Sequence, residues 1–336
     1  MWKYIGKRCL YMLGILLLLS FLVFAVYNLL PVDKAADMAM QEIAANKNLN
    51  YAELYLYWQR KYGLDGGLLT RYLRWFGLKS FYDGSFNGLL QGNLGTSVAY
   101  GKPVLEVVKE PLLNTVFLNG FGAVEALGIT IPLGIFCAQK KGSKRDVAVQ
   151  VGTIVGYSMP VFIIAILFIW LFAVKLNIFP VSGMSSVGKD YVGFRAFLDR
   201  LYHFALPLMV MTFCSLGGMT RYVRASMIDA LRQDFIRTAR AKGLRENVVV
   251  RSHAWRHALI PVVSLIIGWF LGIFSGSIMI ENIFGLNGLG KVYFDALTAN
   301  DNEIVLAMQM FYIFLALIGN LLVDLAYGLV DPRIRL

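Results

Sequence analysis

Six long apolar runs alternate with polar segments along this chain, and each is close to the length of a membrane-spanning helix. Crossing a bilayer takes about 20 consecutive apolar residues. The second run contains one charged residue, Glu125, and the other five contain none. The runs are Cys9–Leu30, Leu112–Ala138, Val147–Val174, Phe204–Thr220, Ala258–Ile280 and Ile304–Val323. The pattern predicts an all-α polytopic membrane protein with six transmembrane helices.

Composition argues against a soluble globular domain, because 57% of the residues are hydrophobic and only 16% are charged. The first apolar run is longer than the roughly 7–15 apolar residues of a signal peptide, so we expect it to be a retained helix. The chain then divides into an N-terminal segment with the first transmembrane helix (1–30), an external segment (31–111) and a five-helix core (112–336). The core contains a polar loop at 221–256.

Lysine and arginine are concentrated in one set of polar segments, which carries a net charge of +13, while the other set sums to zero. The basic set is 1–8, 140–146, 221–256 and 331–336, and the neutral set is 31–111, 175–203 and 281–303. Because Lys and Arg are retained on the cytoplasmic side of a membrane, we expect both termini and the basic loop in the cytoplasm. This topology accounts for the basic net charge without a nucleic-acid partner.

The basic loop contains the stretch DFIRTARAKGLRENVVVRSHAWRHALIP, from Asp234 to Pro261. Strong helix formers predict a helix over Ile228–Lys242, ended by a glycine C-cap at Gly243 and followed by a second short helix that leads to His257. Apolar residues at helical spacing predict one buried face, made by Ile228, Leu231, Phe235 and Ala239. We call Asp234–Pro261 the elbow. Basic loops between spans are common, and the plainest alternative is a loop that only sets orientation.

The sequence of the elbow resembles that of the cytoplasmic loop of ABC importer permeases. The resemblance is carried by the stretch RTARAKGL and the later HALIP. The resemblance implies a coupling helix that inserts into a cleft on an ATPase subunit. The ATPase-coupling residues that it implies are Arg237, Thr238, Ala239, Arg240, Ala241, Lys242, Gly243, Leu244 and Pro261.

Other stretches extend this resemblance over most of the chain, and they are similar to the B-type subunit of the oligopeptide, dipeptide and nickel branch. They include YGLDGGLLTRYLRWFG, LLQGNLGTSVAYGKPVLEVV, SMPVF at 158–162, AVKLNIFPVSG at 173–183, ENIFGLNGLGK at 281–291 and NLLVDLAYGLVDPRIRL at 320–336. One departure is Pro31-Val32-Asp33-Lys34, where the family usually has a Pro-Gly-Asp-Pro-like turn.

The resemblance implies a type I ABC importer permease in a bacterial inner or plasma membrane. It implies a homologous second permease, two ATPase subunits and an external substrate-binding protein as partners. Peptides are the cargo that it favours, with nickel complexes or another small solute as the alternative. No cofactor is expected on this chain, since ATP and magnesium would be held by the ATPase subunits.

Two functional motifs are incomplete in this sequence. Gly285–Lys291 matches the first part of a phosphate-binding loop, but Val292 replaces the Ser or Thr that holds magnesium. His253 and His257 have the spacing of a zinc site, but no glutamate stands between them to act as a base. The runs also lack the clustered polar groups of a membrane enzyme and the inverted repeat of many secondary transporters. We therefore expect a non-catalytic permease subunit.

Glu125 lies near the middle of the second run. A carboxylate facing lipid at that depth costs about 2.5–3.5 kcal/mol, so we expect it to face protein or water, with Gly122 and Gly128 leaving room on the same face. One alternative is a protonated carboxyl that is bonded to a neighbouring helix. The other is a pathway residue that meets a cationic or amine-bearing cargo. Glu125, Met159 and Pro160 form the candidate pathway set.

The external segment is rich in tyrosine and tryptophan, and glycines divide its second half into turns. Ala52–Tyr62 is predicted to be helical. Aromatic residues favour the membrane–water interface, so the segment is either a cap on the lipid headgroups or a docking surface for an external partner.

Overall fold

The computed structural model describes residues 2–30 and 33–330, and those residues are mainly helical, with no β-strand among them. The N-terminal helices are α1 (Trp2–Asn28), α2 (Lys34–Ala45), α3 (Tyr51–Lys61), α4 (Leu68–Phe76) and the 3₁₀ turn η1 (Leu89–Gln91). The central ones are α5 (Val104–Gln139), α6 (Lys144–Ser158), α7 (Val161–Phe168), the π-helix η2 (Ile169–Lys175) and α8 (Phe194–Leu231). The remainder are α9 (Asp234–Ala241), α10 (Glu246–Val248), the π-helix η3 (Val249–Ala254), α11 (Trp255–Gly272), α12 (Ile278–Ile283), α13 (Leu289–Thr298) and α14 (Asn302–Val330).

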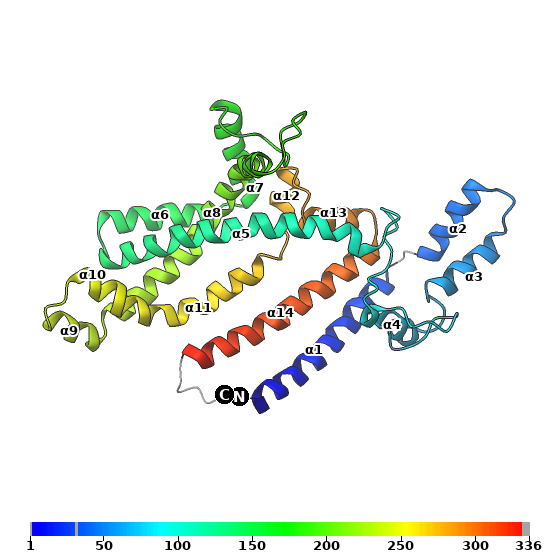
Figure 1. Cartoon of the computed structure of the whole chain (residues 1–336), viewed down its shortest axis with the longest axis horizontal. Coiled ribbons are helices and arrows are strands. Elements are labelled where there is room, and N and C mark those ends of the chain that lie inside the picture. The colour runs from blue at the N-terminus through cyan, green and yellow to red at the C-terminus, as the bar shows by residue number, and fades with distance from the viewer. Residues whose placement is uncertain (1, 31–32, 331–336) are drawn as a thin grey trace. The chain divides into compact units, whose positions relative to one another are not determined.

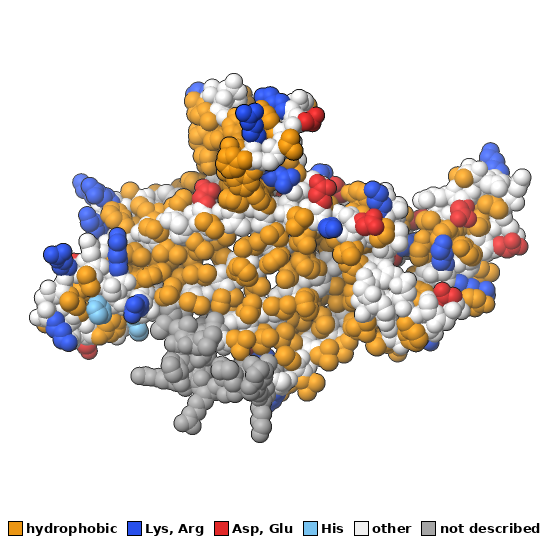
Figure 2. Space-filling model, in the orientation of Figure 1, with side chains coloured by type: hydrophobic (Ala, Val, Ile, Leu, Met, Phe, Trp, Pro, Cys, Tyr) orange, Lys and Arg blue, Asp and Glu red, His pale blue; other side chains and the backbone are white. Residues whose placement is uncertain are grey.

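The described residues contain four candidate spans, or up to six if each of two bent helix pairs is one span, which confirms the predicted polytopic helical fold. Helices α1, α5, α8 and α14 are long and apolar enough to cross a membrane alone, and two bent pairs can each supply one more span. Helix α5 exposes hydrophobic side chains such as Leu113, Val124 and Ile129. Hydrophobic side chains cover much of the face that Figure 2 shows. Such a surface suits contact with lipid or with other subunits.

Two predicted spans are not continuous helices. The third turns by 106° between α6 and α7, because Met159 precedes Pro160 and takes an extended conformation (ψ 137°). A residue before proline is disfavoured in the helical region, and proline has no N–H for the helix ladder. The fifth, expected to run to Ile280, ends at Gly272, and the backbone of Gly276 then packs against Gly290. A side chain at Gly276 would overlap that backbone, so this close approach requires glycine.

The chain divides into two compact units, residues 1–109 with 293–317 and residues 110–292 with 318–336. The domain boundaries expected from the sequence stay a prediction. In the first unit, α2 and α3 lie side by side, and Ala35, Ala39 and Trp58 are buried between them (Figure 1). Helix α3 confirms the predicted helix at 52–62. The departure noted at Pro31 and Val32 lies outside the described residues.

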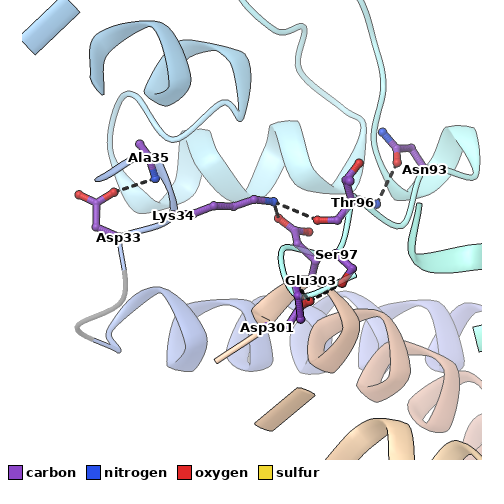
Figure 3. A network of polar contacts seen from close by, with 10 residues as sticks. Asp33, Lys34, Ala35, Asn93, Thr96, Ser97, Asp301 and Glu303 are labelled. Atoms are coloured by element: carbon purple, nitrogen blue, oxygen red, sulfur yellow. Dashed lines mark hydrogen bonds and ion pairs between the residues drawn. The ribbon is translucent and has the colours of Figure 1, made fainter. Parts of the chain in front are cut away.

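A polar network in the first unit joins the loops of the 31–111 segment to the start of α14 (Figure 3). The Lys34 ammonium lies 2.6 Å from the Glu303 carboxylate and donates to the Thr96 carbonyl. The Ser97 hydroxyl and the Ala99 N–H both donate to Asp301, which is 1% exposed. The loop that contains Thr96, Ser97 and Ala99 is thus held by polar and charged hydrogen bonds to Lys34 and Asp301.

In the second unit, glycines let α8 approach two other helices closely. A Cβ at Gly134 of α5 would lie 2.8 Å from Val223, and one at Gly156 of α6 would lie 2.9 Å from the Phe213 carbonyl. A Cβ at Gly217 of α8 would overlap the Thr153 carbonyl of α6 and would lie 2.6 Å from Tyr157 Cβ. Helix α6 lies along α8 in Figure 1. Small residues of this kind allow close helix packing in membranes.

Gly217→Ala should separate α6 from α8, because the added methyl group would overlap a backbone carbonyl that cannot rotate away. We expect a loss of about 1–3 kcal/mol of stability from this overpacking, measured as a lower thermal midpoint in detergent. The control is Gly218→Ala on the same turn, since nothing lies within 4 Å of a Cβ there. Equal midpoints for the two variants would contradict this packing.

Candidate functional site

The elbow begins with a break in the predicted helix. Helix α8 ends at Leu231, Gln233 is extended (ψ 151°), and α9 starts at Asp234. The predicted single helix over Ile228–Lys242 is therefore wrong at Arg232 and Gln233. The break has a local cause, since an acidic residue is favourable in the first turn of a new helix and Asp234 occupies that place.

Gly243 ends α9 as predicted. Its φ of +75° lies in the left-handed region, and its N–H donates to the Arg240 carbonyl at 2.9 Å. The next N–H, of Leu244, donates to Ala239 at 3.4 Å. Glycine takes this conformation without strain, whereas a β-branched residue does not. The chain then passes through α10 and η3 into α11, in place of the predicted short helix.

The buried face of α9 consists of Ile236 and Ala239, at 0% and 5% exposure. They share one apolar cluster with Met227 and Ala230 of α8 and with Val249, Val250 and Ala254 of η3. Phe235 was predicted to be on this face and is 41% exposed, with its ring edge-on to His257. The register differs because α9 starts anew after the break, so the spacing counted from Ile228 does not carry over.

The opposite face of α9 is polar and open. Arg237, Thr238, Ala241 and Lys242 are exposed. Arg240 forms a two-pronged ion pair with Glu246 of α10, with atoms 2.6 and 3.1 Å apart, which joins the two helices of the elbow. Lys and Arg side chains gather over α9 and α10 in Figure 2. Such a face can bind a partner with acidic groups or exposed carbonyls.

The remaining candidate residues lie on other elements. Pro261 is inside α11, where the helix axis bends by 60°. Met159 and Pro160 form the bend between α6 and α7, and Met159 packs against the cluster that contains Ile164 and Phe204. Of the predicted set, only Arg237–Leu244 thus form one continuous segment, and within it Ala239 is buried.

Glu125 is partly exposed in the middle of α5. Gly122, one turn earlier, packs against Leu208 and Met211 of α8. A Cβ added at Gly128 would have no other atom within 4 Å. The Thr212 hydroxyl of α8 is buried, and the Glu125 carboxyl lies near enough to interact with it. Glu125 therefore lies between a helix neighbour on one side and open space on the other.

A buried carboxyl that the sequence did not single out organises the turn at 277–291. Glu281, 1% exposed, accepts bonds from the Ser277 N–H (3.1 Å), the Lys291 N–H (2.8 Å) and the Thr115 hydroxyl (3.1 Å). Burial raises the pKa of Glu281, and these donors oppose that rise. A Cβ at Gly288 would lie 2.5 Å from the carboxyl. Gly288 of the stretch ENIFGLNGLGK therefore leaves room for the buried Glu281 carboxyl. No local sequence pattern marks this contact.

Comparisons with known proteins cover the whole chain. The family described as "Binding-protein-dependent transport system inner membrane component" matches residues 130–336. The oligopeptide transport system permease protein AppB of Bacillus subtilis is 35% identical over 99% of both chains. The dipeptide transport system permease protein DppB of Escherichia coli K12 is 32% identical over 94% of both chains. A solved structure of the MetNI methionine ABC transporter aligns with 66% of this chain and 97% of its own at a TM-score of 0.49 and 16% identity.

Glu281→Gln should weaken the turn at 277–291. An amide turns one of the two acceptor oxygens into a donor that faces other donors, and an unpaired buried group costs about 1–3 kcal/mol. We expect a lower thermal midpoint and faster proteolysis within 277–291. Glu110→Gln, at an exposed glutamate of α5, is the matched control and should behave as wild type. A wild-type midpoint for Glu281→Gln would refute this role.

Proposed function

Because the chain belongs to the family of binding-protein-dependent transport system inner membrane components, we propose that it is the membrane-spanning permease subunit of an ABC importer for oligopeptides or dipeptides. The observation that carries the proposal is the elbow, whose helix α9 has one face buried in an apolar cluster with α8 and η3 and the other open to a partner. Identity to peptide permeases over almost the full chain supports the cargo class. Nickel complexes or another small solute are the alternative cargo.

The proposed complex contains this chain, a homologous second permease, two ATPase subunits and an external substrate-binding protein. The pathway lies between the two permeases, in a bacterial inner membrane. Both termini and the elbow face the cytoplasm, as the distribution of Lys and Arg indicates. The 31–111 segment lies outside, where its exposed Tyr57 and Tyr82 contact the binding protein or cap the pathway. This chain holds no nucleotide and has no catalytic role.

In this mechanism the elbow converts movement of the ATPases into movement of the spans. Closure of the ATPases on ATP displaces α9 by its exposed face at Arg237 and Thr238. Its buried face moves with it, because Ile236 and Ala239 share a core with α8 and η3. Close-packed cores shift as units between discrete arrangements rather than stretch. The spans then alternate between inward-facing and outward-facing states.

Gly243→Val should uncouple ATP hydrolysis from uptake. A non-glycine residue in the left-handed region costs roughly 1–2 kcal/mol, more for a β-branched one, so the junction between α9 and α10 strains or straightens. The measurement is peptide uptake per ATP in vesicles that contain the whole complex. Gly243→Asn is the matched control, since asparagine tolerates positive φ and the site has room for a side chain. Normal uptake per ATP by Gly243→Val would disprove coupling through this turn.

Co-purification tests the subunit composition. An affinity tag on this chain should bring down two ATPase subunits and a second permease in fixed ratio. A secondary transporter would purify without an ATPase.

Glu125, Met159 and Pro160 are proposed to line the pathway, where Glu125 meets a cationic or amine-bearing cargo. Glu125→Gln keeps the shape and most hydrogen bonds but removes the charge. We expect uptake of Lys-containing peptides to fall by about tenfold, the equivalent of about 1.4 kcal/mol. Neutral peptides measured in the same vesicles are the control. Unchanged uptake of both classes would leave Glu125 a structural carboxyl that is bonded within the helix bundle.

A further inference from the structure

A buried ion pair joins the start of α6 to α8. Arg224 donates from Nε and from a terminal nitrogen to the two oxygens of Asp146, both at 2.7 Å. The Asp146 side chain is 1% exposed and that of Arg224 is 17% exposed. The Gly142 N–H at 2.9 Å and the Gln150 amide at 3.0 Å also donate to the carboxylate, and the Cys137 thiol of α5 lies near enough to interact with it. We call this pair the clamp.

The clamp is unlike the other contacts between these helices. Elsewhere α6 and α8 meet through Gly156 and Gly217, which bring the backbones close, and through the Arg221 guanidinium of α8, which lies 5.1 Å from the centre of the Tyr157 ring of α6. Smooth contacts of this kind allow one helix to slide or rotate past the other. A two-pronged arginine–carboxylate pair has a fixed geometry and strong bonds, so it permits neither movement. A buried ion pair is by itself weak grounds for stability, because desolvation of both charges opposes their attraction.

The clamp lies between the elbow and the candidate pathway residues Met159 and Pro160. Arg224 is two turns before the end of α8, where Met227 and Ala230 join the cluster that buries α9. Asp146 is in the first turn of α6, whose far end is the bend at Met159 and Pro160. A displacement of the elbow therefore reaches α8 through an apolar core, and the clamp is the rigid bond by which α8 can carry α6 with it.

We propose that Asp146 and Arg224 are positioning residues that transmit the movement of the elbow from α8 to α6 and so to the bend at Met159–Pro160. This inference rests on the proposed function as a permease driven through the elbow. Without the clamp, α8 moves but α6 slips along its glycine contacts. ATP is then hydrolysed without a matching change at the bend.

The test separates transmission from stability with two variants of the whole complex. Asp146→Asn leaves Arg224 as an uncompensated buried cation and should lower both the thermal midpoint and uptake per ATP. Asp146→Asn with Arg224→Gln removes both charges, so the midpoint should return toward wild type. Uptake per ATP should stay about tenfold low in the double variant, within the usual range for coupling between sites. Asp229→Asn, at an exposed aspartate of α8, is the matched control and should change neither quantity.

A second readout does not depend on the cargo. Ser158 is exposed at the end of α6, and a cysteine there can be labelled with a maleimide in a chain that lacks Cys9 and Cys214. Cys137 is kept, because it is buried and interacts with Asp146. With the clamp intact, ATP should change the labelling rate severalfold. In the double variant the rate should be the same with and without ATP.

The outcomes of these experiments distinguish the role of the clamp from the proposed peptide cargo. A double variant with normal uptake per ATP, or with ATP-dependent labelling, overturns the clamp. Labelling that ignores ATP with the clamp intact overturns it as well, since α6 is then not driven. A complex that imports no peptide but shows clamp-dependent labelling contradicts the peptide cargo and supports the clamp.

Discussion

The burial of Ile236 and Ala239 against α8 and η3 is the contact on which the rest of this account depends. A helix of eight residues is too short to be stable alone in water, so α9 keeps its shape because tertiary packing holds it. The same packing joins α9 to one apolar cluster with α8, η3 and α11. Force applied to its exposed face thus reaches α8 and α11 directly, and Gly243 provides the turn that keeps this face presented.

Beyond the elbow, the second unit combines close contacts with a few fixed polar bonds. Glycines at 134, 156 and 217 bring α5 and α6 against α8. Glu281 fixes the turn at 277–291, and the clamp joins the start of α6 to α8. This division suits a protein that must move. Close contacts at glycines let helices shift, and directional hydrogen bonds determine which helices shift together.

The sequence predicted the four continuous spans, the helix at 52–62, the glycine cap at Gly243 and the family resemblance. These features rest on local signals, namely apolar run length, helix propensity and a residue that tolerates positive φ. It did not predict the break at Arg232–Gln233, and so it placed Phe235 on the buried face. The clamp and the Glu281 turn were missed for a different reason. Both join residues that are distant in sequence, 78 positions apart in the case of Asp146 and Arg224, and no local pattern marks such partners.

Chemical cross-linking of the elbow to an ATPase subunit tests the central claim most directly. A single cysteine at Arg237, on the exposed face of α9, should cross-link to the ATPase in the intact complex, with an efficiency that changes when ATP is bound. A cysteine at Val192, which is exposed in a segment predicted to lie outside the membrane, should give no such product. A complex in which Arg237 fails to cross-link to any ATPase subunit, or cross-links no more than Val192, would contradict the elbow as the coupling element.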